Sequence, residues 1–166
     1  MTADESTVMT ANEEPAIAAK EEPAAKAKGG VPLRILAIDD HPSVLIAIEY
    51  FVSTLGYTVI PVRSGSHGIE IATEEGNISL VLLDIDMPVM NGYAVLEAFQ
   101  AHPELRRIPV IMITGRMNRD VVARGLAAGA RAVLAKPFDL QELQDEIAKN
   151  IASGLSGADA SAPPAK

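Results

Sequence analysis

Residues 80–88 read LVLLDIDMP: four aliphatic side chains, then two acids separated by one residue, then a proline two residues on. An aliphatic run of this length that stops abruptly at a charge is typical of a strand buried on both faces of a parallel sheet. Three other runs also stop at or near a polar residue: Ile35–Ile38 before Asp39 and Asp40, Val110–Ile113 before Thr114, and Ala132–Leu134 shortly before Lys136. We therefore expect four similar strands, each with polar chemistry at its carboxyl end.

Helical patterns alternate with these strands. The segments after the first and the last of them space their apolar residues at three and four: Val44, Leu45, Ile48, Phe51, Val52 and Leu55 in the first segment, and Leu140, Leu143, Ile147 and Ile151 in the last. Residues 57–62 suggest a further strand, whose Pro61 suits an edge. With helical patterns near 65–75, 92–101 and 118–128, the alternation predicts an α/β fold, a doubly wound parallel sheet of five strands with helices on both faces.

The polar residues at the strand ends belong at one place in such a fold. Parallel strands share one carboxyl edge, so the carboxylates of Asp39, Asp40 and Asp84, the Thr114 hydroxyl and the Lys136 ammonium should converge there. An arriving phosphoryl group and a carboxylate repel each other, by about 4 kcal/mol at about 4 Å and a dielectric of about 20. A dication offsets that repulsion, and Mg²⁺ prefers oxygen ligands of this kind. The combination predicts a phosphoryl site.

Five short motifs stand in the order and spacing of a known family: Ile38-Asp39-Asp40, Leu82 to Pro88, Asn91-Gly92, Ile113-Thr114-Gly115 and Lys136-Pro137-Phe138. On these motifs the chain resembles the receiver domain of two-component response regulators, of the stand-alone chemotaxis-regulator kind, over residues 31–152. The resemblance implies a flavodoxin-like sheet with strand order 2-1-3-4-5. It also implies a cis peptide bond before Pro137.

The resemblance gives each residue of the predicted site a role. Asp84 is the phosphoacceptor, Lys136 neutralises one phosphoryl oxygen, and the Thr114 hydroxyl donates to another. Asp40 and Asp84 bind Mg²⁺ directly. Asp39 acts mainly through water, and the backbone carbonyl of Asp86 completes the protein ligands of the metal.

The function implied is that of a single-domain response regulator. Its donor would be a phosphohistidine on a sensor histidine kinase or on a histidine phosphotransfer protein, in a two-component or phosphorelay pathway. The phosphorylated form would signal by binding a downstream protein target. We expect no enzymatic turnover of outside substrates, only slow loss of phosphate from Asp84 itself.

Simpler interpretations exist for two of the motifs. Asp39 and Asp40, just before Pro42, could cap the first helix, because carboxylates accept from free N–H groups there. Asn91-Gly92 is best explained as a turn and a helix cap, outside the site chemistry. Taken singly, neither motif decides the function.

A different function class is suggested by Asp84 and Asp86, which also form the DxD pattern of haloacid-dehalogenase-type phosphohydrolases. That fold carries its acid pair on the first strand, whereas here another acid pair comes first. A binding module that no longer takes phosphate is disfavoured, because the set of Asp40, Asp84, Thr114 and Lys136 is complete.

Two positions depart from the receiver pattern. Val133 stands three residues before Lys136, where receivers usually carry a Tyr or Phe that rotates during the switch, so output is expected mainly in the loop and helix after the fourth strand. Asp86 adds a carboxylate beside the acceptor, which Arg116 could offset. The three histidines share no metal-ligand spacing and are assigned no role: His41, His67 and His102.

Composition restricts the remaining possibilities. The chain of 166 residues has a net charge of −8, which disfavours a direct nucleic-acid partner, and its lack of cysteine excludes disulfides and thiolate catalysis. Because the sequence contains no long apolar stretch, we expect neither a membrane span nor export. We expect a cytoplasmic location. Residues 1–30 are rich in Ala, Glu, Lys and Pro and are predicted to be a disordered tail. Residues 153–166 are predicted to be a flexible tail, too short for an output domain.

Overall fold

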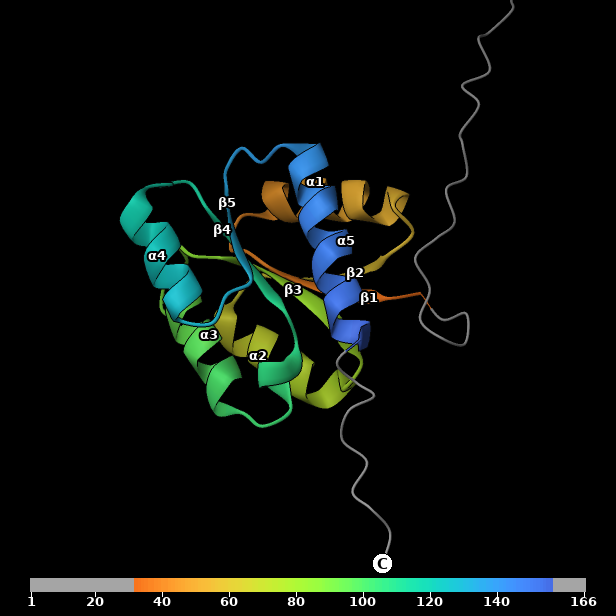
Figure 1. The fold of residues 1–166 in the computed structure, drawn as a ribbon, viewed down its shortest axis with the longest axis horizontal. Helices are drawn as coiled ribbons and strands as arrows, with labels where there is room; N and C mark the ends of the chain where they lie inside the picture. Colours follow the sequence, from red (N-terminus) through yellow and green to blue (C-terminus); the bar gives the residue numbers. More distant parts are fainter. Residues whose placement is uncertain (1–31, 157–166) are drawn as a thin grey trace, which may run out of the picture.

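The computed structural model describes residues 32–156. Its sheet contains five parallel strands in the order β2-β1-β3-β4-β5: β1 (Arg34–Ile38), β2 (Thr58–Val62), β3 (Ile78–Asp84), β4 (Val110–Thr114) and β5 (Ala132–Ala135). The helices of this part are α1 (Pro42–Thr54), α2 (Gly65–Glu75), α3 (Gly92–Ala101), α4 (Arg119–Ala127) and α5 (Leu140–Ser156), with a 3₁₀ turn η1 (Leu105–Arg107). The predicted fold class and strand order are confirmed (Figure 1).

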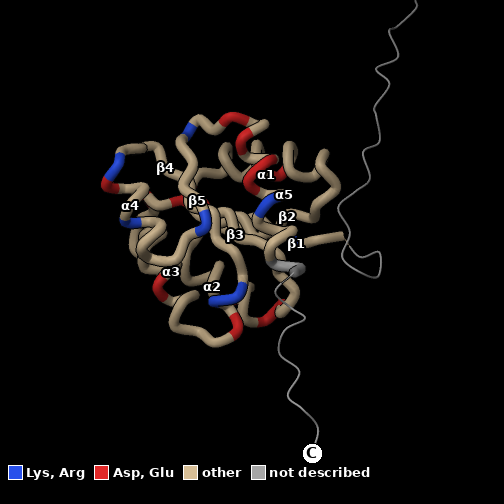
Figure 2. Tube along the Cα trace, viewed as in Figure 1, with Lys and Arg blue, Asp and Glu red and all other residues tan. Residues whose placement is uncertain are grey.

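Hydrophobic cores lie on both faces of the sheet, because the side chains of each strand alternate between the two faces. Ile35 and Ala37 of β1 belong to the core beneath α1 and α5, whereas Leu36 and Ile38 belong to the core beneath α2 and α3. Figure 1 shows α1 and α5 on one side of the sheet and α2, α3 and α4 on the other. In Figure 2 charge is concentrated on the helices and loops. Double-sided burial explains the uninterrupted aliphatic runs.

The predicted apolar stripes of the first and last helices form these cores, with two corrections. Three residues of α1 are buried, while the other three of its stripe are only partly covered; the buried ones are Leu45, Ile48 and Val52. In α5, Leu143, Ile147 and Ile151 are buried, each contributing about 1.5 to 3 kcal/mol. Leu140, by contrast, is 49% exposed, because it begins the helix ahead of the first turn that reaches the core.

Pro61 lies on β2, an edge strand as predicted, where a missing N–H costs little. The end of α5 differs from the prediction: the helix continues to Ser156, through residues assigned to the tail. Ser153 Oγ donates to the carbonyl of Lys149 at 2.9 Å, a bond that small polar residues form inside helices. The predicted tail at 1–30 and the residues after 156 lie outside the described part. Within residues 32–156 the structure contains no helix long and apolar enough to span a membrane.

Candidate functional site

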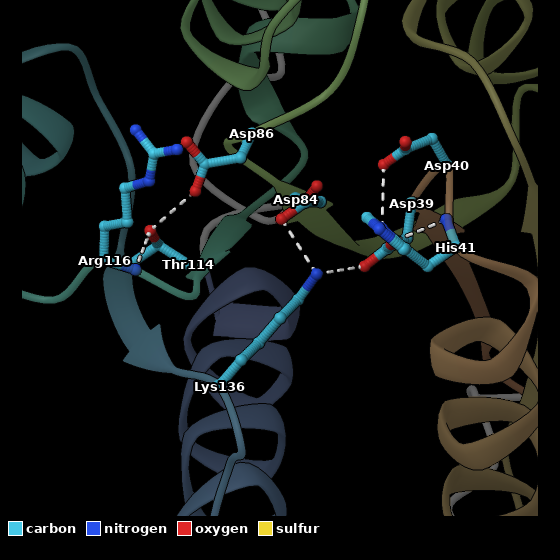
Figure 3. Close-up of polar contacts among 8 residues, drawn as sticks. All are labelled: Asp39, Asp40, His41, Asp84, Asp86, Thr114, Arg116 and Lys136. Carbon is cyan, nitrogen blue, oxygen red and sulfur yellow. Dashed lines mark hydrogen bonds and ion pairs between the residues drawn. The ribbon is translucent and has the colours of Figure 1, made fainter.

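The carboxyl edge of the sheet brings together polar residues from four strand ends, as Figure 3 shows. Backbone hydrogen bonds between neighbouring strands fix their positions. The Asp39 N–H donates to the carbonyl of Val62 at 3.0 Å, and the Lys136 N–H donates to that of Thr114 at 2.7 Å. Asp84, the last residue of β3, is held in register by its pairing with Ile113 of β4. The predicted convergence at this edge is therefore observed.

Lys136 links two buried carboxylates. Its Nζ donates to Asp84 Oδ1 at 2.9 Å and also to Asp39 Oδ2. The side chains of Asp39 and Asp84 are 2% and 1% exposed, and that of Lys136 is 18% exposed. A buried ion pair of this kind adds little net stability, yet losing one partner leaves the others uncompensated. Two carboxylates share one ammonium, so the pocket retains a negative charge.

The pKa values in this cluster reflect burial and pairing. Burial raises the pKa of the Asp84 carboxyl, and the hydrogen bond and charge of Lys136 offset only part of that rise. Burial lowers the pKa of Lys136, but its hydrogen bonds to Asp39 and Asp84 and their charges outweigh burial and raise that pKa above the usual value of 10.5. Lys136 therefore remains an ammonium throughout the physiological pH range.

Two carboxylate oxygens of the site are buried and accept no hydrogen bond: Asp84 Oδ2, and Asp40 Oδ1, whose near polar neighbour is the His41 ring nitrogen Nδ1 at 3.1 Å. A buried carboxylate oxygen that accepts no hydrogen bond is costly, so such atoms suit binding of a cation or a donor. Oxygens of Asp39, Asp40 and Asp84 and a ring nitrogen of His41 lie within 4.8 Å of one another. A set dominated by carboxylate oxygens suits Mg²⁺, a hard cation. The residues present therefore fit the metal that the family resemblance implies.

The capping interpretation of Asp39 and Asp40 is wrong. His41 is the N-cap residue of α1, Pro42 follows it, and α1 has no side-chain cap bond. Asp39 Oδ1 instead accepts from the backbone N–H of His41 at 2.8 Å, which fixes the carboxylate at the strand end. The His41 ring, to which sequence analysis assigned no role, lies with Nδ1 3.1 Å from Asp40 Oδ1. Only its position next to the acid pair signals this in the sequence.

Thr114 is buried at the end of β4, but its hydroxyl does not bond to Asp84 or Lys136 in the described structure. It donates to Asp86 Oδ2 at 3.2 Å and accepts from the backbone N–H of Arg116 at 3.0 Å. Figure 3 shows these three residues as a group beside Asp84, with Arg116 extending along the same side as Asp86. The structure thus places the predicted hydroxyl beside Asp84 and ties it to a different carboxylate, that of Asp86.

Asn91 and Gly92 shape the loop after β3, as predicted, without entering the site chemistry. Asn91 is the N-cap of α3, and its side chain accepts from the Ala94 N–H at 3.0 Å. A Cβ on Gly92 would lie 2.8 Å from Ile85 Cα and closer still to the Asp84 carbonyl oxygen. Only glycine therefore lets α3 approach Ile85 so closely.

Val133 is half-buried under α4. Its Cγ2 atom lies so close to this helix that a Cβ added to Gly125 would be only 2.8 Å away. Receivers usually carry an aromatic ring at the position of Val133, but here the aromatic ring near α4 belongs to Tyr93 of α3. The Arg124 guanidinium lies 4.0 Å from the centre of that ring. Tyr93 Oη donates to the carbonyl of Val121 at 3.4 Å. Sequence analysis missed this contact between α3 and α4, because nothing in the spacing of the two residues indicates it.

Comparison with known proteins decides the family. The model of the response regulator receiver domain matches residues 35–148. The chain belongs to this family. The Lys136–Pro137 peptide bond is cis, as the resemblance implied.

Relatives of this receiver domain occur in bacteria and plants. It is 30% identical to chemotaxis protein CheY of Pseudomonas aeruginosa over 118 residues, 70% of this chain and 94% of that protein. It is 31% identical to two-component response regulator ORR11 of Oryza sativa subsp. indica over 109 residues, 66% of this chain and 74% of that protein.

Solved structures of receiver domains are similar in fold to this chain. A CheY-like response regulator receiver domain protein from Methanospirillum hungatei superposes with a TM-score of 0.68 at 28% identity, covering 75% of this chain and 98% of the other. A receiver domain protein from Clostridium thermocellum gives 0.68 at 29% identity, covering 73% and 95%. The homology is consistent with phosphoryl acceptance on an aspartate in two-component signalling, and nothing in it supports the phosphohydrolase alternative.

Proposed function

We propose that Asp84 of this receiver domain accepts a phosphoryl group from a phosphohistidine on a sensor histidine kinase or a histidine phosphotransfer protein. The observation that supports this most directly is the state of the Asp84 carboxylate. One oxygen is held by Lys136 at 2.9 Å, and the other is buried without a hydrogen bond at the carboxyl edge of the sheet. A fixed carboxylate with one free oxygen is suited to attack on phosphorus.

In the transfer, an Asp84 oxygen forms a bond to phosphorus as the bond between phosphorus and the donor's ring nitrogen breaks. The electron pair of the broken bond returns to that nitrogen, and the donor leaves as neutral imidazole when its other ring nitrogen carries a proton. Charge in the transition state is spread over the three other phosphoryl oxygens. The Lys136 ammonium, already within 2.9 Å of Asp84 Oδ1, is placed to stabilise one of them.

Asp39, Asp40, Asp84 and the backbone carbonyl of Asp86 would hold Mg²⁺. When bound, this ion neutralises the repulsion between the carboxylates and the anionic phosphoryl group. The cluster of Asp39, Asp40 and Asp84 supports that assignment, as does the buried Asp84 Oδ2, which accepts no hydrogen bond. The Thr114 hydroxyl would donate to a phosphoryl oxygen once it has left Asp86.

The phosphorylated domain would signal by binding a protein target. Movement of Thr114 would be transmitted to residues 115–118 and to α4, since the Arg116 N–H bonds to the Thr114 hydroxyl. Val133 cannot swing a ring, and it packs against Gly125 beneath the same helix. We further propose that the protein turns over no outside substrate and loses phosphate only slowly from Asp84.

Replacement of the acceptor tests this proposal. With acetyl phosphate and Mg²⁺, the wild-type protein should gain one phosphate by mass spectrometry, and Asp84→Asn should gain none, because an amide is a poor nucleophile. Glu97→Gln, the same chemical change at an exposed position on α3, should be phosphorylated like the wild type. Equal phosphorylation of Asp84→Asn would overturn the assignment, and rapid multiple turnover of a phosphate ester would favour the phosphohydrolase.

A further inference from the structure

The Thr114 hydroxyl takes part in two hydrogen bonds at once. It donates its single proton to Asp86 Oδ2 at 3.2 Å and accepts the Arg116 N–H at 3.0 Å. Thr114 is 1% exposed, so water scarcely reaches it, whereas Asp86 is exposed. The hydroxyl is therefore committed to a carboxylate that is not the phosphoacceptor.

A hydroxyl has one proton to donate. It cannot donate to Asp86 and to a phosphoryl oxygen on Asp84 at the same time. The Asp86 carboxylate and a phosphoryl oxygen both carry negative charge, and both accept charge-assisted hydrogen bonds, so Asp86 competes for that proton.

We propose that Asp86 is a positioning residue that holds the Thr114 hydroxyl away from the phosphoryl site and thereby stabilises the unphosphorylated conformation. The inference rests on the proposed phosphorylation of Asp84. Phosphorylation then requires an exchange of partners: the Thr114 proton leaves the Asp86 carboxylate, which solvent can hydrate, and turns to the phosphoryl oxygen.

The same exchange reaches α4. Because the Arg116 N–H bonds to the Thr114 oxygen, rotation of the Thr114 side chain moves the acceptor that holds Arg116, in the loop before α4. Asn118, at the end of this loop, caps α4 by accepting from the Val121 N–H at 2.9 Å. Two contacts, the Arg116 bond and the Asn118 cap, therefore connect the Thr114 hydroxyl, which Asp86 holds, with the start of α4.

Asp86 has a second way to oppose phosphorylation, which is direct repulsion of an anion by its charge. The two mechanisms predict different couplings. Repulsion acts whether or not residue 114 has a hydroxyl, whereas capture of the proton needs one. Substitutions at both positions separate them.

The experiment measures beryllofluoride affinity in the presence of Mg²⁺ for four proteins: wild type, Asp86→Ala, Thr114→Val and the double variant. Asp86→Ala should tighten binding by about threefold to tenfold, less than the usual contribution of a hydrogen bond to a charged group, because Asp86 is solvated. In the Thr114→Val background the same substitution should change affinity by less than about twofold. Equal tightening in both backgrounds would assign the effect to charge and overturn the inference, as would no tightening with Thr114 present.

A second measurement needs neither metal nor anion. In the metal-free protein, Asp86→Ala should increase rotamer averaging of the Thr114 side chain, seen in the NMR signals of its methyl group, and should speed hydrogen exchange of the Arg116 amide. Glu97→Ala removes an exposed carboxylate on α3 and should change neither. Unchanged Thr114 and Arg116 signals in Asp86→Ala would overturn the inference. Failure of the wild type to bind beryllofluoride would count against the phosphorylation of Asp84, and this metal-free comparison would still decide the role of Asp86.

Discussion

Removal of the Lys136 ammonium should destabilise the metal-free fold. In Lys136→Met, the carboxylates of Asp39 and Asp84 lose their shared partner while staying buried. Their clustered oxygens lie within 4.8 Å of each other, where two unit charges repel by about 3.5 kcal/mol at a dielectric of about 20. Loss of one partner of a buried ion pair typically costs about 3 to 5 kcal/mol, which is similar to this repulsion. We expect the free energy of unfolding at pH 8 to fall by about 3 kcal/mol.

The pH dependence of that loss has a definite sign. Lys136 lowers the pKa of Asp84, so the variant should show an Asp84 pKa raised even further above its unfolded value. A raised carboxyl pKa favours the folded state as pH falls, so the difference between variant and wild type should shrink toward acid pH. At the other extreme, the raised pKa of Lys136 means that its stabilisation is fully present below about 10.5 and is lost as pH rises through the folded-state value.

Urea unfolding at pH 8 and pH 5.5, with and without Mg²⁺, measures these effects. Mg²⁺ should stabilise Lys136→Met more than the wild type, because it meets a more negative site. Lys149→Met is the control: its side chain is 70% exposed and pairs with Glu146 at 3.1 Å, so its loss should cost less than about 0.5 kcal/mol. A loss below about 1 kcal/mol for Lys136→Met, or one independent of pH, would refute the account of the buried pair.

Further predictions follow from the same cluster and from the chain ends. Asp84→Asn should raise the metal-free melting temperature at pH 8, since the raised pKa of Asp84 shows that its charged form is disfavoured by folding; a lower melting temperature would contradict this. Asp40→Ala should weaken Mg²⁺ binding at least about tenfold in a titration without destabilising the fold, and unchanged affinity would exclude Asp40 as a ligand. Deletion of residues 1–30 and 157–166 should leave the melting temperature and phosphate uptake nearly unchanged, and a large fall in melting temperature would contradict this by showing that a segment docks on the domain. Hydrogen exchange with beryllofluoride and Mg²⁺ should change protection in the β4–α4 loop and α4 far more than at Val133, and a dominant change in β5 would argue against that output route.

The strands, the helices and the fold class could be predicted from the sequence, because the aliphatic runs and the polar residues that end them are local signals. The strand order 2-1-3-4-5 came from the family resemblance. Asp84 and Thr114 are the last residues of β3 and β4, as the abrupt end of each run indicated. Leu140 and the end of α5 were harder, because the first and the last turns of a helix depend on what lies beside them.

The site was predicted as a set of residues more completely than as a set of contacts. Strand ends place Asp39, Asp84 and Lys136 together whatever their rotamers, and the structure joins these three through one ammonium. The bond from Thr114 to Asp86 depends on side-chain rotation within a loop, and spacing carries no information about that. Asp86 was accordingly expected to act through its backbone carbonyl and its charge alone.

Chemical mapping of the phosphorylated residue tests the central claim most directly. Borohydride reduces an acyl phosphate on aspartate to homoserine, which mass spectrometry locates in a peptide. After phosphotransfer from a phosphohistidine donor with Mg²⁺, the account predicts homoserine at position 84 and unmodified Asp39, Asp40 and Asp86. Homoserine at one of those three positions, or acid-labile phosphate on His41 in its place, would contradict it.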